Sequence, residues 1–285
     1  MSSLIVERKT IELSEQRNKM IISGWGIEAL QNSVVEKITY LSDKLKITGY
    51  IAYPKDSENG AKFPCIIWNR GGVGENGAID EFTAKGMFGQ MAAWGYVVFA
   101  SMYRGNCGGE GTEDLGGEDV NDILNLIPLA DEIPCANKNL WGIEGWSRGG
   151  MMTFMALTRN PVFKCAVFAG AISDLKEYTD KGSKTGAFFR KALGDEKFEA
   201  MIAQRSIINF VDKLPRKTAM LIMHGSNDDT VSPLQSIELS KKLLSVGMHH
   251  RFILFEGGNH HLSRHRKEVD KIRKAWYKKY LTEND

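Results

Sequence analysis

Short apolar segments alternate with segments of helical periodicity along most of this chain, and this alternation limits the folds that it can adopt. The apolar, strand-like segments are residues 64–68, 96–101, 140–144, 165–169, 219–224 and 251–255. Helical spacing of apolar residues marks residues 79–94, 119–129, 148–158, 233–244 and 264–280. Strands that are apolar throughout are typical of a parallel sheet buried on both faces. The pattern therefore predicts an α/β fold, with a mostly parallel sheet and helices on both faces.

Two segments depart from this alternation. Residues 34–41 and 45–53 are β-branched runs separated by a short polar turn, which predicts an antiparallel hairpin at the edge of the sheet. Residues 173–214 are charged and rich in helix formers, so we interpret them as a small helical cap inserted above the sheet. We see no repeat or linker, and we expect one domain over residues 34–285 after an N-terminal extension, residues 1–33.

Composition excludes several classes of partner. The 285 residues carry a formal net charge of +2, which gives no electrostatic argument for nucleic acid or an anionic membrane. The closing helix is basic, but its apolar face indicates docking on a sheet. Four cysteines lack C-x-x-C spacing, so we expect free thiols in a reducing compartment. With no signal-peptide core and no apolar run of membrane-spanning length, we expect a cytoplasmic protein.

The sequence around Ser147 matches a nucleophile motif. Residues 145–150 spell GWSRGG, which contains G-x-S-x-G. This chemistry needs a serine at the tip of a sharp strand-to-helix turn, with small residues two positions before and after it. The match alone is weak, but a predicted strand leads into it and a predicted helix leads out. We therefore interpret Ser147 as a nucleophile, against the alternative of a glycine-rich loop with an incidental serine.

Candidates for a general base and a supporting acid follow Ser147 in the order that the α/β-hydrolase fold requires. His260 lies in the loop after the strand at 251–255, with His261 as its neighbour and rival. Asp228 and Asp229 lie in the loop after the strand at 219–224. We set aside His224, which no later acid could serve. His249 and His250 precede a strand and so belong to the opposite end of the sheet. The pattern predicts a Ser-Asp-His triad, with either aspartate as the acid.

Acyl transfer also needs hydrogen-bond donors for the oxyanion of the tetrahedral intermediate. We expect one donor to be the backbone N–H of Arg148, the residue after the nucleophile. We expect the second in the glycine-rich loop after the strand at 64–68, from Gly71 or Gly72. The sequence does not distinguish these two glycines.

Several of these motifs together resemble the catalytic domain of the prolyl oligopeptidase family of serine peptidases. The resembling stretches are YRG at 103–105, GWSRGG at 145–150, RSIINFVD at 205–212, HGSNDDTV at 224–231 and EGGNH at 256–260. The likeness runs from about residue 34 to the C-terminus. It implies an α/β-hydrolase catalytic domain in which Asp228 is the acid and His260 the base, rather than Asp229 and His261. It also implies peptidase activity without a metal or organic cofactor.

Some positions depart from the family pattern and bear on the substrate. Arg148 stands where a tyrosine or histidine is common, and Arg70 where many members place a tyrosine. Arg70 and Trp146 are candidate substrate-binding residues. An inward-facing Arg70 or Arg148 would favour a substrate carboxylate, whereas the alternative is an internal ion pair. We expect short peptides or aminoacyl amides as substrates, with small acyl esters as the alternative, and leave a homo-oligomer open.

Two further motifs suggest other chemistries. Gly72, Gly74 and Gly77 match the dinucleotide fingerprint G-x-G-x-x-G, which would indicate a nicotinamide-dependent oxidoreductase. That motif needs a tighter strand-to-helix turn than this loop allows, and it leaves the predicted triad unexplained. The histidines near residue 260 could suggest a metal site, but no H-E-x-x-H motif or carboxylate cluster accompanies them. We therefore expect no metal ligand.

Overall fold

The computed structural model describes residues 3–55, 60–180, 187, 190–191 and 194–282. The chain divides into two compact units. The first comprises Met1–Arg70, Gly74–Glu113 and Asn121–Gly142. The second comprises Gly71–Val73, Asp114–Val120 and Ile143–Asp285, and it contains the predicted nucleophile, acid and base.

The strands of the first unit follow the order β1-β2-β3-β5-β4-β6. Their bounds are Ile5–Thr10 (β1), Ser33–Ser42 (β2), Leu45–Pro54 (β3), Phe63–Asn69 (β4), Val97–Ser101 (β5) and, continuing into the second unit, Ala136–Trp146 (β6). Strands β2 and β3 form the expected antiparallel hairpin, with Ser42 opposite Leu45. Its two turn residues, Asp43 and Lys44, both have positive φ, which matches the twist of a tight hairpin. Strands β4 and β5 are parallel.

Strand β1 is an element that the sequence did not predict. It pairs antiparallel with β2 and forms the edge of the sheet, a place that we had expected the hairpin to take. Only Ile5 of its six residues is buried, and the rest of the strand, VERKT, is exposed. An exposed, charged edge strand lacks the apolar alternation by which strands are recognised. It is stabilised by pairing and by the Arg8–Glu36 ion pair.

One helix of the first unit differs from the sequence prediction. Helices α1 (Glu15–Trp25) and α2 (Glu28–Gln31) precede β2, and α3 (Glu81–Ala93) packs on β2, β3 and β5. Helix α3 begins beyond the glycine loop, where the Asp80 side chain caps the Thr83 N–H. In place of the single helix expected over residues 119–129, the structure has α4 (Val120–Leu124) and then a 3₁₀ turn at Pro128–Glu132. All of α4 except Val120 belongs to this unit. Pro128 explains the break, because in a continuous helix its ring would clash with the carbonyl group of Leu124, four residues earlier.

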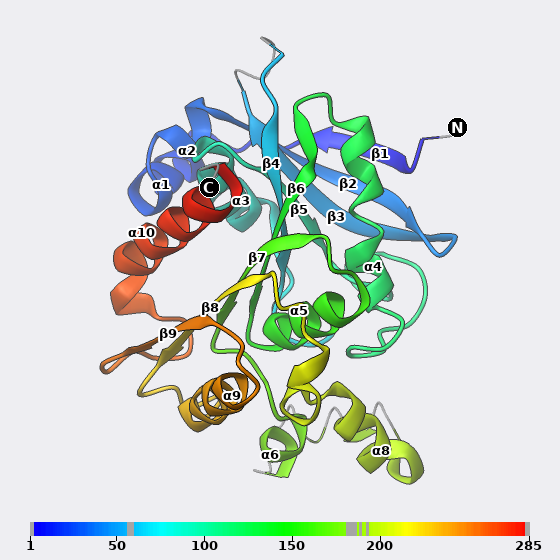
Figure 1. Ribbon diagram of the computed structural model, residues 1–285. Coiled ribbons are helices and arrows are strands. Elements are labelled where there is room, and N and C mark those ends of the chain that lie inside the picture. Colours follow the sequence, from blue (N-terminus) through cyan, green and yellow to red (C-terminus); the bar gives the residue numbers. More distant parts are fainter. Residues whose placement is uncertain (1–2, 56–59, 181–186, 188–189, 192–193, 283–285) are drawn as a thin grey trace. The chain divides into compact units, whose positions relative to one another are not determined.

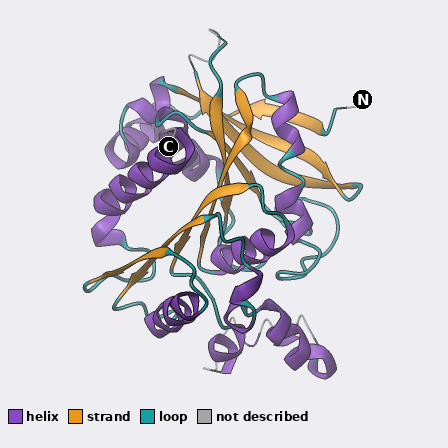
Figure 2. Cartoon of the chain, in the orientation of Figure 1, coloured by secondary structure: helices purple, strands orange, loops and turns teal. Residues whose placement is uncertain are grey.

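In the second unit the strand order is β6-β7-β8-β9, with β7 parallel to β8 and β8 parallel to β9. The bounds are Phe163–Ala169 (β7), Ala219–Gly225 (β8) and His250–Phe255 (β9). Helices α5 (Arg148–Arg159) and α9 (Pro233–Ser245) lie on one side of these strands, and α10 (Arg266–Tyr277) lies on the other (Figure 1; Figure 2). Strands β7 and β8 are almost wholly buried between these layers. The predicted architecture, a mostly parallel sheet covered on both faces, is confirmed.

The remaining segments differ in detail from the expected pattern. Within residues 173–214 the structure has α6 (Leu175–Asp180), α8 (Asp195–Arg205) and 3₁₀ turns at Ile207–Asn209 and Val211–Lys213, and no strand among the described residues. Residues 181–186, 188–189 and 192–193 of this segment lie outside the described part. The closing helix expected over 264–280 is α10, preceded by a 3₁₀ turn and followed by a π-helical turn, Lys278–Thr282.

Two further findings concern the whole described chain. The four cysteines are free thiols, as the sequence predicted. None of the described helices combines the length and the apolar character that crossing a bilayer requires.

Candidate active site

Ser147 occupies the turn between β6 and α5. Its backbone has φ 56° and ψ −124°, a conformation that side-chain-bearing residues rarely adopt. A Cβ at Gly145 would lie 2.0 Å from the Gly149 carbonyl oxygen, so only glycine fits two residues before the serine. The Ser147 N–H donates to the Ala169 carbonyl at the end of β7, at 2.9 Å. The sequence motif therefore folds into the strained strand-to-helix elbow that presents a serine hydroxyl.

A buried charged cluster, which the sequence did not predict, lies directly before this elbow. The Glu144 carboxylate, fully buried three residues before Ser147, accepts hydrogen bonds from Arg273 at 2.8 Å and from the Tyr277 hydroxyl at 2.5 Å. Its other oxygen accepts the Trp146 indole N–H at 2.6 Å. Burial raises the pKa of Tyr277, so its hydroxyl remains a donor. Helix α10 is thereby tied to the end of β6, directly before Ser147.

Asp228 and His260 are in direct contact. They lie in the loops that follow β8 and β9, and His260 Nδ1 is 2.7 Å from Asp228 Oδ2. Backbone hydrogen bonds join these two loops, from Ser226 N–H to Phe255 O and from Asn227 N–H to Gly258 O. Because Nδ1 faces a carboxylate, it carries the imidazole proton, and Nε2 is left as the acceptor. This is the tautomer that a general base needs.

His224, which sequence reasoning set aside, is the second histidine on Asp228. It is fully buried, and its Nε2 lies 3.0 Å from both Asp228 Oδ2 and the Val231 carbonyl oxygen. Its Nδ1 lies 2.7 Å from Ser236 Oγ. Asp228 Oδ1 accepts the backbone N–H groups of Thr230 and Val231, each at 2.9 Å. The carboxylate is thus held from both sides.

These contacts keep Asp228 ionised. Burial alone would favour the neutral acid, but hydrogen bonds from His224 and His260 outweigh it, so the pKa of Asp228 is well below its ordinary value. A depressed folded-state pKa contributes stability at pH values above the pKa of the unfolded chain. That contribution is lost as the pH falls through the folded-state value. Asp228 therefore remains an anion throughout the neutral range.

Ser147 and the Asp228–His260 pair all lie beyond the carboxyl ends of their strands, β6, β8 and β9. Gly170, the residue after β7, marks their proximity. A Cβ there would lie 3.2 Å from His260 Nδ1 and 3.3 Å from Asp228 Oδ2, while its neighbour Ala169 bonds to Ser147. Ser147 Oγ makes no hydrogen bond to a described residue. Such bonds often tighten only when substrate is bound.

The neighbouring candidates differ from these residues in exposure. Asp229 and His261 are both exposed, whereas Asp228 is 8% exposed. The ring of His261 packs edge-on against His260, with 5.2 Å between the centroids. Asp229 accepts a hydrogen bond from the Thr230 hydroxyl. Among the described residues, no hydrogen bond joins Asp229 to His260 or His261 to Asp228. The geometry therefore favours the same pair that the family resemblance implies.

We expect Asp228→Asn to lower kcat by about 10⁴-fold, because the amide favours the wrong imidazole tautomer. Asp229→Asn should change kcat by less than about tenfold, since its side chain is solvated. Steady-state kinetics on an activated ester, with thermal unfolding as the check on folding, would compare the two. A larger loss in the Asp229 variant would show that the acid is misplaced by one residue.

Gly71, in the loop after β4, lies against Ser147. A Cβ at Gly71 would lie 3.0 Å from the Trp146 carbonyl oxygen and 3.2 Å from Ser147 Cβ. The Gly72 carbonyl oxygen accepts a hydrogen bond from the Arg148 guanidinium at 2.9 Å. Both glycines predicted for the oxyanion site thus lie in the second unit, beside Ser147 and Arg148.

The two arginines named as candidates for a substrate carboxylate are engaged within the protein. Arg148 is 2% exposed and pairs with Asp119 at 3.0 Å. Arg70, in the first unit, is fully buried and donates to the carbonyls of Met102 and Gly74. These contacts match the internal role that the sequence left as the alternative. Trp146 is partly exposed, and its indole is held by Glu144.

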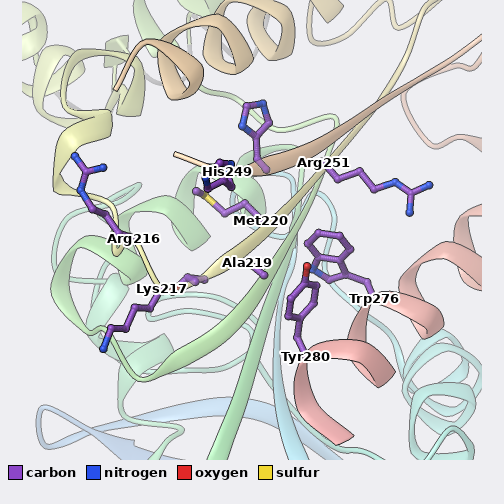
Figure 3. A pocket seen from close by; sticks show the side chains of 10 residues that line it. Arg216, Lys217, Ala219, Met220, His249, Arg251, Trp276 and Tyr280 are labelled. Carbon is purple, nitrogen blue, oxygen red and sulfur yellow. The ribbon is translucent and has the colours of Figure 1, made fainter. Parts of the chain in front are cut away.

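A pocket of about 390 Å³ in the second unit is separate from this site. It is lined by the first residues of β8 and β9 together with Trp276 and Tyr280, at the end of the strands opposite to Asp228 and His260. Figure 3 shows that its cations, Arg216, Lys217 and Arg251, point away from one another. Among the described residues, no group of three or more His, Cys, Asp or Glu side chains has an arrangement that could hold a metal ion.

Comparisons with known proteins agree with the fold and with the resemblance. Residues 84–284 match the model of the prolyl oligopeptidase family. An uncharacterized peptidase of Bacillus subtilis, YtmA, is 31% identical over 209 residues, which cover 72% of this chain and 78% of that protein. The acylaminoacyl peptidase of Pyrococcus horikoshii superposes with a TM-score of 0.77 at 24% identity, over 96% of this chain and 45% of that one.

An acylaminoacyl peptidase solved with Z-Gly-Gly-Phe-chloromethyl ketone gives a TM-score of 0.76 at 26% identity. It is matched over 94% of this chain and 44% of its own length, so the chain spans less than half of these two solved relatives. The family model covers most of the chain, and both solved structures superpose over nearly all of it. The chain therefore belongs to the prolyl oligopeptidase family of serine-type peptidases and has the α/β-hydrolase fold.

Proposed function

We propose that this chain hydrolyses acyl compounds with Ser147 as nucleophile, His260 as general base and Asp228 as the group that orients it. The observation that carries this proposal is the 2.7 Å contact between His260 Nδ1 and Asp228 Oδ2, beside a serine at a strained elbow. A buried Asp–His pair alone is not evidence of catalysis, because such pairs also stabilise folds. Its position at the same sheet edge as the elbow favours catalysis.

The reaction proceeds in two steps, acylation of Ser147 and hydrolysis of the acyl-enzyme. His260 Nε2 takes the proton of Ser147 as Oγ attacks the carbonyl carbon, and the oxyanion forms beside the backbone N–H groups of Arg148 and of Gly71 or Gly72. Asp228 stabilises the imidazolium, which then protonates the leaving group. Water repeats the sequence on the acyl-enzyme, and this second half releases the acid and restores the serine hydroxyl.

We propose short peptides or aminoacyl amides as the substrate class. Support comes from the family, whose solved relatives include one bound to a peptide chloromethyl ketone. An amide demands more of His260 than an ester does, because an amine must be protonated to leave. The Asp228 carboxylate, held ionised by four donors, supplies the partner that an imidazolium in this role needs.

We further propose that residues 173–214 restrict substrate size. This segment begins beside the nucleophile, where the Ile172 N–H donates to the Ser147 carbonyl at 3.3 Å. Its first residue is anchored by a hydrogen bond from the Ser173 N–H to the Gln235 side chain, and within the segment the Leu175 N–H donates to Ser206 Oγ. A segment fixed in this way at the rim of a site excludes water and large substrates.

The test is kcat/KM on a matched panel of short-chain acyl esters, aminoacyl amides and dipeptidyl amides. We expect measurable cleavage of amides as well as esters, with rates that fall as the peptide lengthens. Ester turnover without amide cleavage across the panel would replace the peptidase by a carboxylesterase. The absence of any turnover, together with no reaction with a fluorophosphonate, would refute the proposed function.

A further inference from the structure

The side chain of Arg148 is turned into the protein, immediately after the nucleophile. One terminal nitrogen donates to the Gly72 carbonyl oxygen at 2.9 Å, and the other lies 3.0 Å from Asp119 Oδ2. Arg148 is 2% exposed and Asp119 is fully buried. Since a buried charge is stable only when it is paired and hydrogen-bonded, this geometry is strongly determined.

Asp119 is itself fixed by the loop that carries it. Its Oδ1 accepts the Gly116 N–H at 2.8 Å. The same loop is held by two more arginines. Arg159 donates to the Gly117 carbonyl at 2.9 Å, and Arg205 pairs with Asp114 at 2.9 Å. The Asp119 carboxylate that holds Arg148 therefore belongs to a loop whose position is fixed by hydrogen bonds and an ion pair.

The other end of the Arg148 fork reaches the loop that faces the nucleophile. Gly71 packs against Ser147 Cβ, and the next carbonyl along the chain, that of Gly72, accepts the guanidinium N–H. Gly72 has φ 71°, a conformation that glycine adopts freely, so its peptide group needs an external contact to fix its orientation. The Arg148 side chain thus links its own backbone N–H, one expected oxyanion donor, to the Gly71–Gly72 loop, where the other is expected.

We propose that the Arg148 guanidinium, held by Asp119, is a positioning group that fixes the Gly71–Gly72 backbone relative to Ser147 and so preorganises the oxyanion site. This inference rests on the proposed function. Arginine suits the role because its planar fork donates in two fixed directions, which the single ammonium of lysine does not reproduce. Oxyanion stabilisation depends on donors that are already in place when charge develops.

This assignment differs from recognition of a substrate carboxylate. The charge of Arg148 is matched by Asp119, and its bound atoms face the protein. A group that orients the oxyanion donors affects the transition state and leaves ground-state binding almost unchanged. The two roles therefore predict different kinetic signatures.

The test compares wild type with Arg148→Lys. We expect kcat to fall about ten- to a hundredfold with KM nearly unchanged, since the lost interaction acts in the transition state. The Ki of a peptide boronate, which forms a tetrahedral adduct with the serine, should rise by the same factor. Amide hydrogen exchange in Gly71–Val73, which needs no activity, should accelerate. Arg159→Lys is the matched control, because Arg159 contacts the same anchored loop without reaching Gly72.

Asp119→Asn provides a second route if Arg148→Lys does not fold, since the amide oxygen still accepts the Gly116 N–H while the ion pair is lost. Unchanged kcat, Ki and exchange in a folded variant would overturn the proposal, even if thermal stability fell. A rise in KM alone would also overturn it, in favour of substrate binding. An inactive wild-type protein would refute the proposed function, and hydrogen exchange would still decide whether Arg148 fixes the loop.

Discussion

Ser147→Ala is expected to lower kcat by about 10⁵- to 10⁶-fold while leaving the fold intact. The members of a serine triad act as a unit, so loss of the nucleophile removes nearly all of their combined effect. Alanine keeps the Cβ that serine already places at φ 56°, so the elbow gains no new strain. A change in the free energy of unfolding of no more than about 0.5 kcal/mol is expected.

Covalent labelling gives an independent measurement of the same prediction. A fluorophosphonate should modify wild type at Ser147 only, as peptide mapping by mass spectrometry would show, and should not modify the alanine variant. Ser245→Ala is a suitable control, because Ser245 is exposed and bonds only locally to the Lys242 carbonyl. Labelling of a different serine, with turnover retained in Ser147→Ala, would contradict the assignment.

The sheet was predictable from sequence because its central strands are buried on both faces. Runs such as those in β5, β7 and β8 are apolar throughout and are bounded by turns, which leaves little ambiguity. Strand β1 was missed for the opposite reason. One buried residue in six carries no periodic signal, and its place at the edge depends on pairing with β2, which local sequence does not encode.

The site was predictable to the extent that its residues lie at fixed points of the fold. Ser147, Asp228 and His260 each follow a strand whose carboxyl end faces the same edge, so order along the chain implied proximity. The choice of Asp228 over Asp229 needed the family resemblance, because adjacent residues in one loop have the same local signals. The structure separates them by burial and by the contact to His260.

The supporting residues were not predictable in this way. His224 was set aside because only its place in the order of acids and bases was considered. It nevertheless contacts Asp228 from the end of β8, the strand that leads into the loop carrying this aspartate. Glu144 meets Arg273 and Tyr277 across 129 and 133 residues of sequence. Such partners are brought together by tertiary packing, and nothing in the local pattern of either segment identifies them.

His260→Ala should lower kcat about as much as the serine substitution, because without the base the hydroxyl remains a poor nucleophile. His261→Ala should change kcat by less than about tenfold, since His261 is exposed and touches only the edge of the His260 ring. The pair is a matched test. Both variants remove one imidazole from the same loop, so a general effect on the loop would appear in both.

The pH dependence distinguishes a base from a residue that only supports the loop. In wild type, kcat/KM should rise with pH, because a general base accepts the Ser147 proton only in its unprotonated form. Asp228 does not produce this limb, because its pKa is held well below the range in which histidine titrates. His261→Ala should keep the limb, and the residual activity of His260→Ala should lack it. A limb that persists without His260 would assign the proton transfer to another group, and a limb lost with His261 would exchange the two histidines.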